Sequence, residues 1–115
     1  MVTEPFDNWT TQLRKGLLEL CILNSIRKDR LYGYDIVRKL RAVPGLVVSE
    51  GTIYPILSRF KRQGLVRTSV EESPEGPPRK YYRLTEHGEN LLKAMNEYWD
   101  AVSAGADAIQ RGDDR

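Results

Sequence analysis

The sequence is poor in the residues that build covalent and metal-based scaffolds. Its 115 residues include one cysteine, Cys21, and one histidine, His87. A single cysteine cannot form an internal disulfide, and the two residues together fall short of the usual ligand set of a structural zinc site. Disulfide-stabilised and zinc-finger domains are therefore excluded, and we expect neither a metal nor another cofactor. Cys21 stands between Leu20 and Ile22, which predicts an unreactive core thiol.

Long hydrophobic runs are also missing. No apolar stretch approaches the ~18 residues that a membrane span needs. The first ten residues are acidic and carry no basic start, which argues against a secretory signal. With 40% apolar and 30% charged residues and a mean hydropathy of -0.52, the composition is typical of a soluble globular protein. We expect one domain in the cytoplasm, without a membrane partner.

Charge is unevenly distributed, although the net charge is only +2. Residues 11–67 hold twelve basic and four acidic side chains, whereas residues 86–115 hold three basic and seven acidic ones. A basic first half predicts a surface for a polyanion, and the acidic last quarter predicts a separate assembly segment.

Apolar spacing predicts three short helices in the first half. From the possible caps Thr10 and Thr11, a broad apolar stripe runs to Ile26. A bend at residues 31–33 leads into a second helix, which Pro44 and Gly45 end. The third helix is expected to begin after an N-cap at Ser49 and to end at Gly64.

The apolar period changes to two after residue 65. Alternation over residues 66–71 and 79–84 predicts two strands, and the proline-rich residues 73–78 predict the tip of the hairpin between them. Residues 86–110 then read as one long amphipathic helix. We expect a winged helix-turn-helix domain at residues 10–85, a dimerisation helix at residues 86–110, and flexible ends at residues 1–9 and 111–115. The fold class is α+β, mostly α, with a two-stranded wing.

Three sequence blocks carry a family resemblance. They are Leu31-Tyr32-Gly33-Tyr34-Asp35-Ile36, Ser49-Glu50-Gly51-Thr52-Ile53-Tyr54-Pro55, and residues 76–85, which read GPPRKYYRLT. In this order and separation they resemble the signature blocks of PadR-type transcriptional regulators. The single C-terminal helix resembles the short-chain branch of that family, which includes multidrug-sensing repressors. The resemblance implies a DNA-binding regulator rather than an enzyme.

The third helix and the wing are the predicted DNA-binding elements. Apolar residues of the helix face inward, which leaves a polar and basic outer face whose N-terminal turn suits phosphates or base edges. Gly51 lets the backbone approach DNA closely, and Arg59 and Arg62 could reach either bases or phosphates. Pro55 implies either a distorted helix start or a start nearer Thr52. The candidate DNA-binding residues are Tyr34, Ser49, Glu50, Gly51, Thr52, Tyr54, Pro55, Ser58, Arg59, Lys61, Arg62, Arg79 and Lys80.

The last helix carries a predicted second function. Its apolar stripe, together with that of the first helix, predicts a two-fold dimer with recognition helices about 34 Å apart, and therefore a pseudo-palindromic operator. The candidate dimer residues are Leu13, Leu17, Leu91, Leu92, Met95, Tyr98, Trp99, Val102, Ala106 and Ile109. Trp99 resembles in position the tryptophan that lines a pocket between subunits in multidrug-sensing relatives. That resemblance implies a pocket for a planar aromatic effector at Leu17, Met95, Tyr98 and Trp99, although Trp99 filling the dimer core without a ligand is the open alternative.

Two other classes of function were weighed against a dimeric repressor. An enzyme requires a nucleophile with a base or paired acids in a cleft, and no spacing here assembles either. A winged helix used only for protein–protein contact is the alternative, which the basic residues 11–67 disfavour. Strong salt dependence would distinguish DNA binding from an apolar protein interface.

Overall fold

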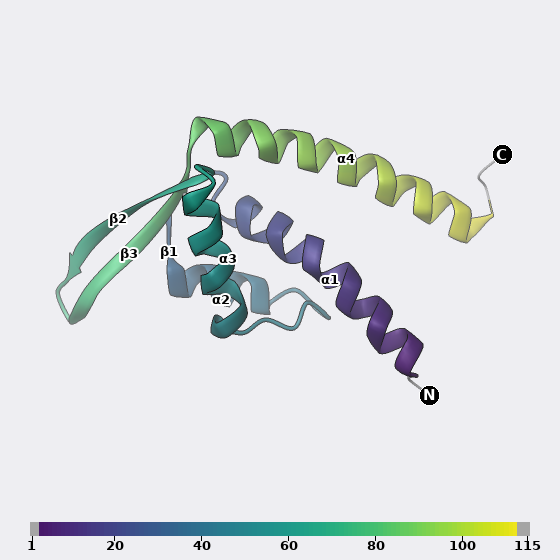
Figure 1. Cartoon of the computed structure of the whole chain (residues 1–115), viewed down its shortest axis with the longest axis horizontal. Coiled ribbons are helices and arrows are strands. Elements are labelled where there is room, and N and C mark those ends of the chain that lie inside the picture. The colour runs from purple at the N-terminus through teal and green to yellow at the C-terminus, as the bar shows by residue number, and fades with distance from the viewer. Residues whose placement is uncertain (1–2, 113–115) are drawn as a thin grey trace.

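The computed structural model describes residues 3–112 and contains four helices and a small sheet (Figure 1). The elements are α1 (Glu4–Ser25), β1 (Leu31–Tyr32), α2 (Gly33–Arg41), α3 (Glu50–Arg62), β2 (Val66–Ser73), β3 (Gly76–Leu84) and α4 (Glu86–Arg111). The β2–β3 hairpin projects from one end of the molecule, and α1 and α4 extend toward the other end, where both termini lie (Figure 1). The order confirms the winged helix-turn-helix architecture.

Helix α1 begins earlier than the sequence predicts. It starts at Glu4, and the Thr3 hydroxyl accepts a hydrogen bond from the backbone N–H of Phe6. Proline in the first turn and acidic side chains near the start favour this beginning. The predicted start at Thr10 is wrong, and residues 4–9 are helical rather than part of a flexible end. Of the other expected flexible end, Arg111 is helical and Gly112 caps α4, while residues 113–115 lie outside the described residues.

Helix α3 begins after Ser49, as predicted, and ends at Arg62, two residues before Gly64, where the sequence predicts the end. Gly64 has a φ of +74°, and the N–H of Leu65 bonds to the carbonyl of Phe60 at 2.9 Å, which is a Schellman ending. Pro55 lies inside the helix, so a start nearer Thr52 is wrong. The proline removes the N–H that would otherwise bond to the carbonyl four residues earlier.

The sheet has three strands in the order β1-β3-β2, all antiparallel. Strand β1 pairs Leu31 with Tyr82, and the bend predicted there missed this short strand. The hairpin turn is also tighter than predicted, because Ser73 pairs with Gly76 and the prolines 77 and 78 already belong to β3. The register shifts between Glu71 and Ser73, where the two prolines of β3 face a single residue of β2, and β1 stops short of them, so their missing N–H groups disrupt no second ladder.

One hydrophobic core joins all the helices to the base of the sheet. Its most deeply buried side chains come from every helix and from the start of the hairpin. They include Ile22, Leu23, Ile36, Val37, Ile53, Leu57, Phe60, Val66 and Leu92. Val70 lies on the same side of β2 as Val66 but is 64% exposed, because the hairpin extends beyond the body there.

The junction of α4 with the rest of the domain is tight. The Thr85 hydroxyl donates to the carbonyl of Gly64 at 2.6 Å and accepts from the N–H of Gly88 at 3.0 Å. A Cβ on Gly88 would lie 2.0 Å from the carbonyl oxygen of Leu65, so only glycine fits. Further along α4, the side-chain amides of Asn24 and Asn96 exchange two hydrogen bonds of 2.9 Å. These contacts fix the direction of α4 relative to α1 and to the turn between α3 and β2.

Candidate nucleic-acid interface

The first turn of α3 is the most open part of the predicted DNA-binding face. Ser49, Glu50, Gly51 and Thr52 are all exposed. The hydroxyls of Ser49 and Thr52 lie 3.0 Å apart and hydrogen-bond to each other. Ser49 is the N-cap residue, as expected, but its side chain makes no hydrogen bond to the helix backbone. A Cβ on Gly51 would meet only the Ser49 hydroxyl, at 3.9 Å. The fold itself therefore does not require glycine at position 51.

Tyr54 connects α3 with the start of α2, where Tyr34 is also exposed. Tyr54 is 36% exposed, and its ring lies so close to Gly33 that a Cβ there would be 3.0 Å from it. Burial, and then the charge of Glu50, raises the pKa of Tyr54 above its usual value, so its hydroxyl is a neutral donor at pH 7. Tyr34 is 42% exposed on the first turn of α2. Its ring centroid is 6.5 Å from that of Tyr32.

The basic residues of α3 divide into two groups. Arg59 is half-buried and its guanidinium forms an ion pair of 2.9 Å with Glu19 of α1. Part of its hydrogen-bonding capacity therefore holds α1 to α3, and its contact with DNA stays a prediction. Lys61 and Arg62 are exposed in the last turn. Pro55 and Ser58, earlier in the helix, are exposed as well. The sequence separation of Glu19 and Arg59 offers no signal for their contact.

The wing residues Arg79 and Lys80 alternate between the two faces of the hairpin. The register places Arg79 opposite Glu71 and Lys80 opposite Val70. The Arg79 guanidinium lies over the Tyr32 ring, 5.0 Å from its centroid. A hollow of about 270 Å³ adjoins both residues and is lined by Tyr32, Gly33, Tyr54, Pro78, Arg79, Lys80 and Tyr82. The structure thus brings the wing, the start of α2 and the N-terminal half of α3 to one surface.

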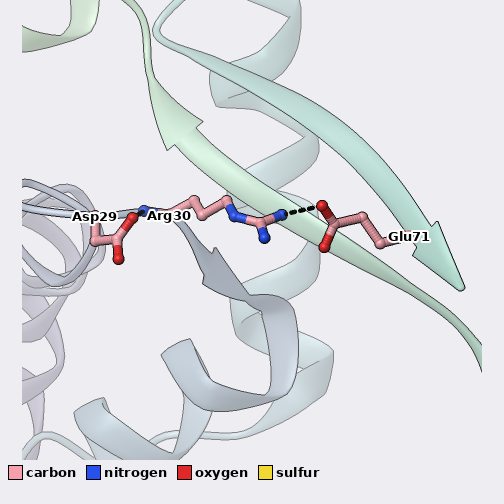
Figure 2. A network of polar contacts seen from close by, with 3 residues as sticks. All are labelled: Asp29, Arg30 and Glu71. Atoms are coloured by element: carbon pink, nitrogen blue, oxygen red, sulfur yellow. Dashed lines mark hydrogen bonds and ion pairs between the residues drawn. The ribbon is translucent and has the colours of Figure 1, made fainter. Parts of the chain in front are cut away.

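Arg30 is a residue of the wing region that the sequence reasoning missed. It lies before β1 and reaches across the hairpin to Glu71 (Figure 2), with a nitrogen–oxygen distance of 2.7 Å. Its guanidinium also covers the Tyr81 ring, 4.2 Å from the centroid. The hydrogen bond that the Arg30 guanidinium donates to Glu71 raises the pKa of Arg30 above its usual value. The backbone N–H of Arg30 donates to the Asp29 carboxylate at 2.8 Å, which orders the start of the connection.

The four candidate effector residues line one groove between α1 and α4. The groove has a volume of about 410 Å³ and is lined by Leu13, Gly16, Leu17, Leu20, Ala94, Met95, Tyr98 and Trp99. Tyr98 is 74% exposed and Trp99 is 37% exposed, so both rings present surface to the solvent in a single chain. Apolar side chains dominate the lining, and no charged group interrupts it.

Most candidate dimer residues form an exposed apolar stripe, with one exception. Leu13, Leu91, Val102 and Ile109 are 38–66% exposed, and Ala106 is exposed beside them. Leu92 is 1% exposed in the core of its own chain, so its assignment to the dimer contact is wrong.

The sequence reasoning also missed an aromatic pair at the start of α1. Phe6 is 49% exposed and Trp9 is 60% exposed, and their ring centroids lie 6.3 Å apart. These rings extend the apolar surface of α1 beyond the predicted stripe. The expectation of a flexible N-terminal end obscured them.

The described residues contain neither a metal-binding cluster nor a membrane-spanning helix. Residues 3–112 contain no group of three or more histidine, cysteine or acidic side chains that could hold a metal ion. No helix in that range is both long and apolar enough to span a membrane. Cys21 is partly buried against the core, and burial raises the pKa of its thiol, so at pH 7 it is the unreactive thiol.

Comparison with known proteins agrees with this architecture. Residues 22–94 match the transcriptional regulator PadR-like family. A PadR-like transcription factor from Bacteroides fragilis is 41% identical, with 89% of this chain and 98% of that chain covered and a TM-score of 0.72. A PadR-like transcriptional regulator from Bacillus cereus is 37% identical, with 86% and 96% covered and a TM-score of 0.78. A Streptococcus transcriptional regulator is 38% identical, with 86% and 97% covered and a TM-score of 0.75.

These relatives are regulators of transcription and not enzymes, which confirms the expectation that the chain is not an enzyme. The family match covers α2, α3, the wing and parts of α1 and α4, so it includes every candidate DNA-binding residue. The chain belongs to the PadR-like family of DNA-binding transcriptional regulators.

Proposed function

We propose that the chain acts in the cytoplasm as a homodimeric repressor that reads a pseudo-palindromic operator with the first turn of α3. The observation that carries the proposal is the exposed turn from Ser49 to Thr52, which contains a glycine that no intramolecular contact requires. Free N–H groups and the positive end of the helix dipole favour phosphates or base edges at this turn. Gly51 allows the backbone to approach them without a side chain in between.

The wing supplies the second part of the proposed DNA contact. Lys80 lies on the side of β3 that faces the hollow beside Tyr54, so its ammonium group can bind the backbone next to the groove that α3 enters. Residues 10–85 form the DNA-binding part in this proposal, joined by residues 4–9 of α1, and residues 86–110 carry the dimer contact. Two-fold symmetry would place the two α3 helices about one DNA turn, ~34 Å, apart.

The proposed dimer contact involves the stripe on α4 and the facing part of α1. Apolar side chains that are 37–74% exposed follow one another from Leu91 to Ile109, which is more apolar surface than a monomeric helix usually leaves to water. Phe6 and Trp9 add to it from α1. A second copy of the chain covers such a surface by symmetry, because each copy offers the same stripe.

The groove lined by Leu17, Met95, Tyr98 and Trp99 is the proposed effector site, and a planar aromatic compound is its proposed ligand. Aromatic rings stack favourably on tryptophan and tyrosine, and a cationic ring gains cation–π attraction as well. Binding would release DNA if the ligand prefers a spacing of the two heads that does not fit the operator. Titration of a Trp9→Phe protein with such compounds tests this, because Trp99 then supplies all of the tryptophan emission and ligand-linked quenching is expected.

DNA binding is tested with a labelled duplex that covers the DNA upstream of the protein's own coding sequence. Fluorescence anisotropy at several salt concentrations is expected to show saturable, sequence-preferring binding that weakens steeply with salt. Lys80→Gln is expected to lower the salt slope by about one per protomer, while Lys93→Gln on α4 serves as a matched control that leaves it unchanged. Weak binding without sequence preference, or equal slopes for both variants, would contradict the proposal.

A further inference from the structure

One face of the wing carries an arginine cluster of which only Arg79 is among the candidate DNA-binding residues. The strand register places Arg67 opposite Arg83 and Glu71 opposite Arg79, all on the face that points away from the core. The alternate residues Val66, Tyr82 and Leu84 are buried on the other face. We call the face that points away from the core the outer wing face. It consists of Arg30, Arg67, Ser69, Glu71, Arg79, Tyr81 and Arg83.

The outer wing face is strongly positive. It holds four arginines and one glutamate. Arg30 forms an ion pair with that glutamate at 2.7 Å and lies over the Tyr81 ring (Figure 2). Because Glu71 already has a partner, it contributes little neutralisation to the remaining arginines. The polar contact in Figure 2 also fixes the connection before β1 against the hairpin.

Arg67 and Arg83 are the exceptional pair on this face. Like charges directly opposite each other on neighbouring strands destabilise a sheet. Both side chains are exposed, and within residues 3–112 neither forms an ion pair. They border a hollow of about 490 Å³ whose other lining residues are Arg30, Thr68, Ser69, Glu71, Tyr81 and Tyr82. Guanidinium groups beside hydroxyls are well suited to bind the oxygens of a phosphodiester.

We propose that the outer wing face is a second phosphate-binding surface, which binds the sugar–phosphate backbone of duplex DNA in addition to the contact made by α3 and Lys80. This inference rests on the proposed DNA-binding function. The same hairpin presents Lys80 on one face and the Arg67–Arg83 pair on the other, so phosphates can be bound on both sides of it. An anionic partner also explains why two arginines stand opposite each other without an acidic side chain between them.

The test uses a fluorescein-labelled 40-bp duplex from the DNA upstream of the protein's own coding sequence, and the full-length chain. Arg67→Gln/Arg83→Gln is compared with wild type, with Lys80→Gln, and with the control Lys15→Gln/Lys93→Gln, which removes the same charge from exposed positions on α1 and α4. The double arginine variant is expected to lower the slope of log K against log salt by about one to two per protomer, and to weaken binding about tenfold or more at 0.1 M salt. Its melting temperature is expected to match or exceed that of wild type, because a like-charge pair is removed.

The possible results separate this inference from the proposed function. If the wild-type chain does not bind the duplex, the proposed function and this inference both fail. If the wild type binds and Lys80→Gln weakens it while Arg67→Gln/Arg83→Gln matches the control, only the inference fails. A parallel titration with labelled poly-L-glutamate covers the other class of partner. Loss of binding to that polymer alone, with DNA binding unchanged, would assign the face to an acidic protein and overturn the inference.

Discussion

Substitution of Gly88 tests the junction that sets the direction of α4. A Cβ at this position would lie 2.0 Å from the Leu65 carbonyl oxygen and 3.0 Å from the carbonyl carbon. Real Cβ atoms essentially never approach closer than 3.0 Å, so Gly88→Ala must separate α4 from the α3–β2 turn by about 1 Å. That movement strains the bond from the Thr85 N–H to the Leu65 carbonyl, now 3.0 Å, and the bond from the Thr85 hydroxyl to Gly64.

The expected loss of stability follows from these contacts. Overpacking costs about 1–3 kcal/mol, and weakening a backbone hydrogen bond adds about 0.5–1.5 kcal/mol. The better helix propensity of alanine offsets about 1 kcal/mol of this. Gly88→Ala is therefore expected to lower the free energy of unfolding by about 0.5–3.5 kcal/mol, which corresponds to a melting temperature roughly 2–17 °C lower.

Urea denaturation followed by circular dichroism measures this change at a fixed protein concentration, because dimer stability depends on concentration. Gly105→Ala is the matched control. It changes a glycine of the same helix around which a Cβ would meet nothing within 4 Å. The control is expected to gain about 0.5–1 kcal/mol. A Gly88→Ala protein as stable as wild type would refute the close approach of α4 to Leu65.

Three further changes test local features of the fold. Val47 has a φ of +54° in the turn before α3 and is 72% exposed, so Val47→Asn is expected to raise the unfolding free energy by about 0.5–1 kcal/mol, and a lower melting temperature would contradict this. Asn96→Leu leaves the Asn24 amide unpaired and is expected to lower the free energy of unfolding by about 1–3 kcal/mol. Adding Asn24→Leu is expected to restore part of that loss in the double variant. Additive losses of the two single variants in urea denaturation would argue against the pair. Burial raises the pKa of Tyr82 in the folded chain. The contribution of the neutral Tyr82 hydroxyl to the free energy of unfolding is therefore complete below the tyrosine pKa of the unfolded chain, near ~10, and is lost as the pH rises above it. Tyr82→Phe is expected to reduce this alkaline loss of stability, and an identical loss in both proteins would count against the burial of Tyr82.

Periodic segments were the parts of the fold that the sequence predicted well. The apolar stripes of α2, α3 and α4 each have enough residues to define a face, and the start of α3 after Ser49 follows from ordinary helix signals. Strand β1 was missed because two residues are too few to show a period. The start of α1 was misplaced although Thr3 followed by Glu4 and Pro5 is itself a start signal.

The candidate site was predicted less completely than the fold, because its side chains interact over long sequence separations. Position on a helix placed Arg59 on the outer arc of α3, but its partner Glu19 lies forty residues earlier. Likewise, the Arg30–Glu71 pair depends on how the connection before β1 crosses the hairpin. The sequence does not show whether Leu92 is buried in the core of its own chain or in a dimer contact, because an apolar residue on α4 suits either environment.

The most direct test of the central claim is the DNA affinity of a Gly51→Gln protein. The fold leaves room for this side chain, because a Cβ would meet only the Ser49 hydroxyl at 3.9 Å. Its stability to urea is therefore expected to equal or exceed that of wild type. If the first turn of α3 lies against DNA, affinity for the upstream duplex falls at least about tenfold, in line with the roughly 1–3 kcal/mol that a lost specific contact costs. Wild-type affinity in the folded variant would contradict the account.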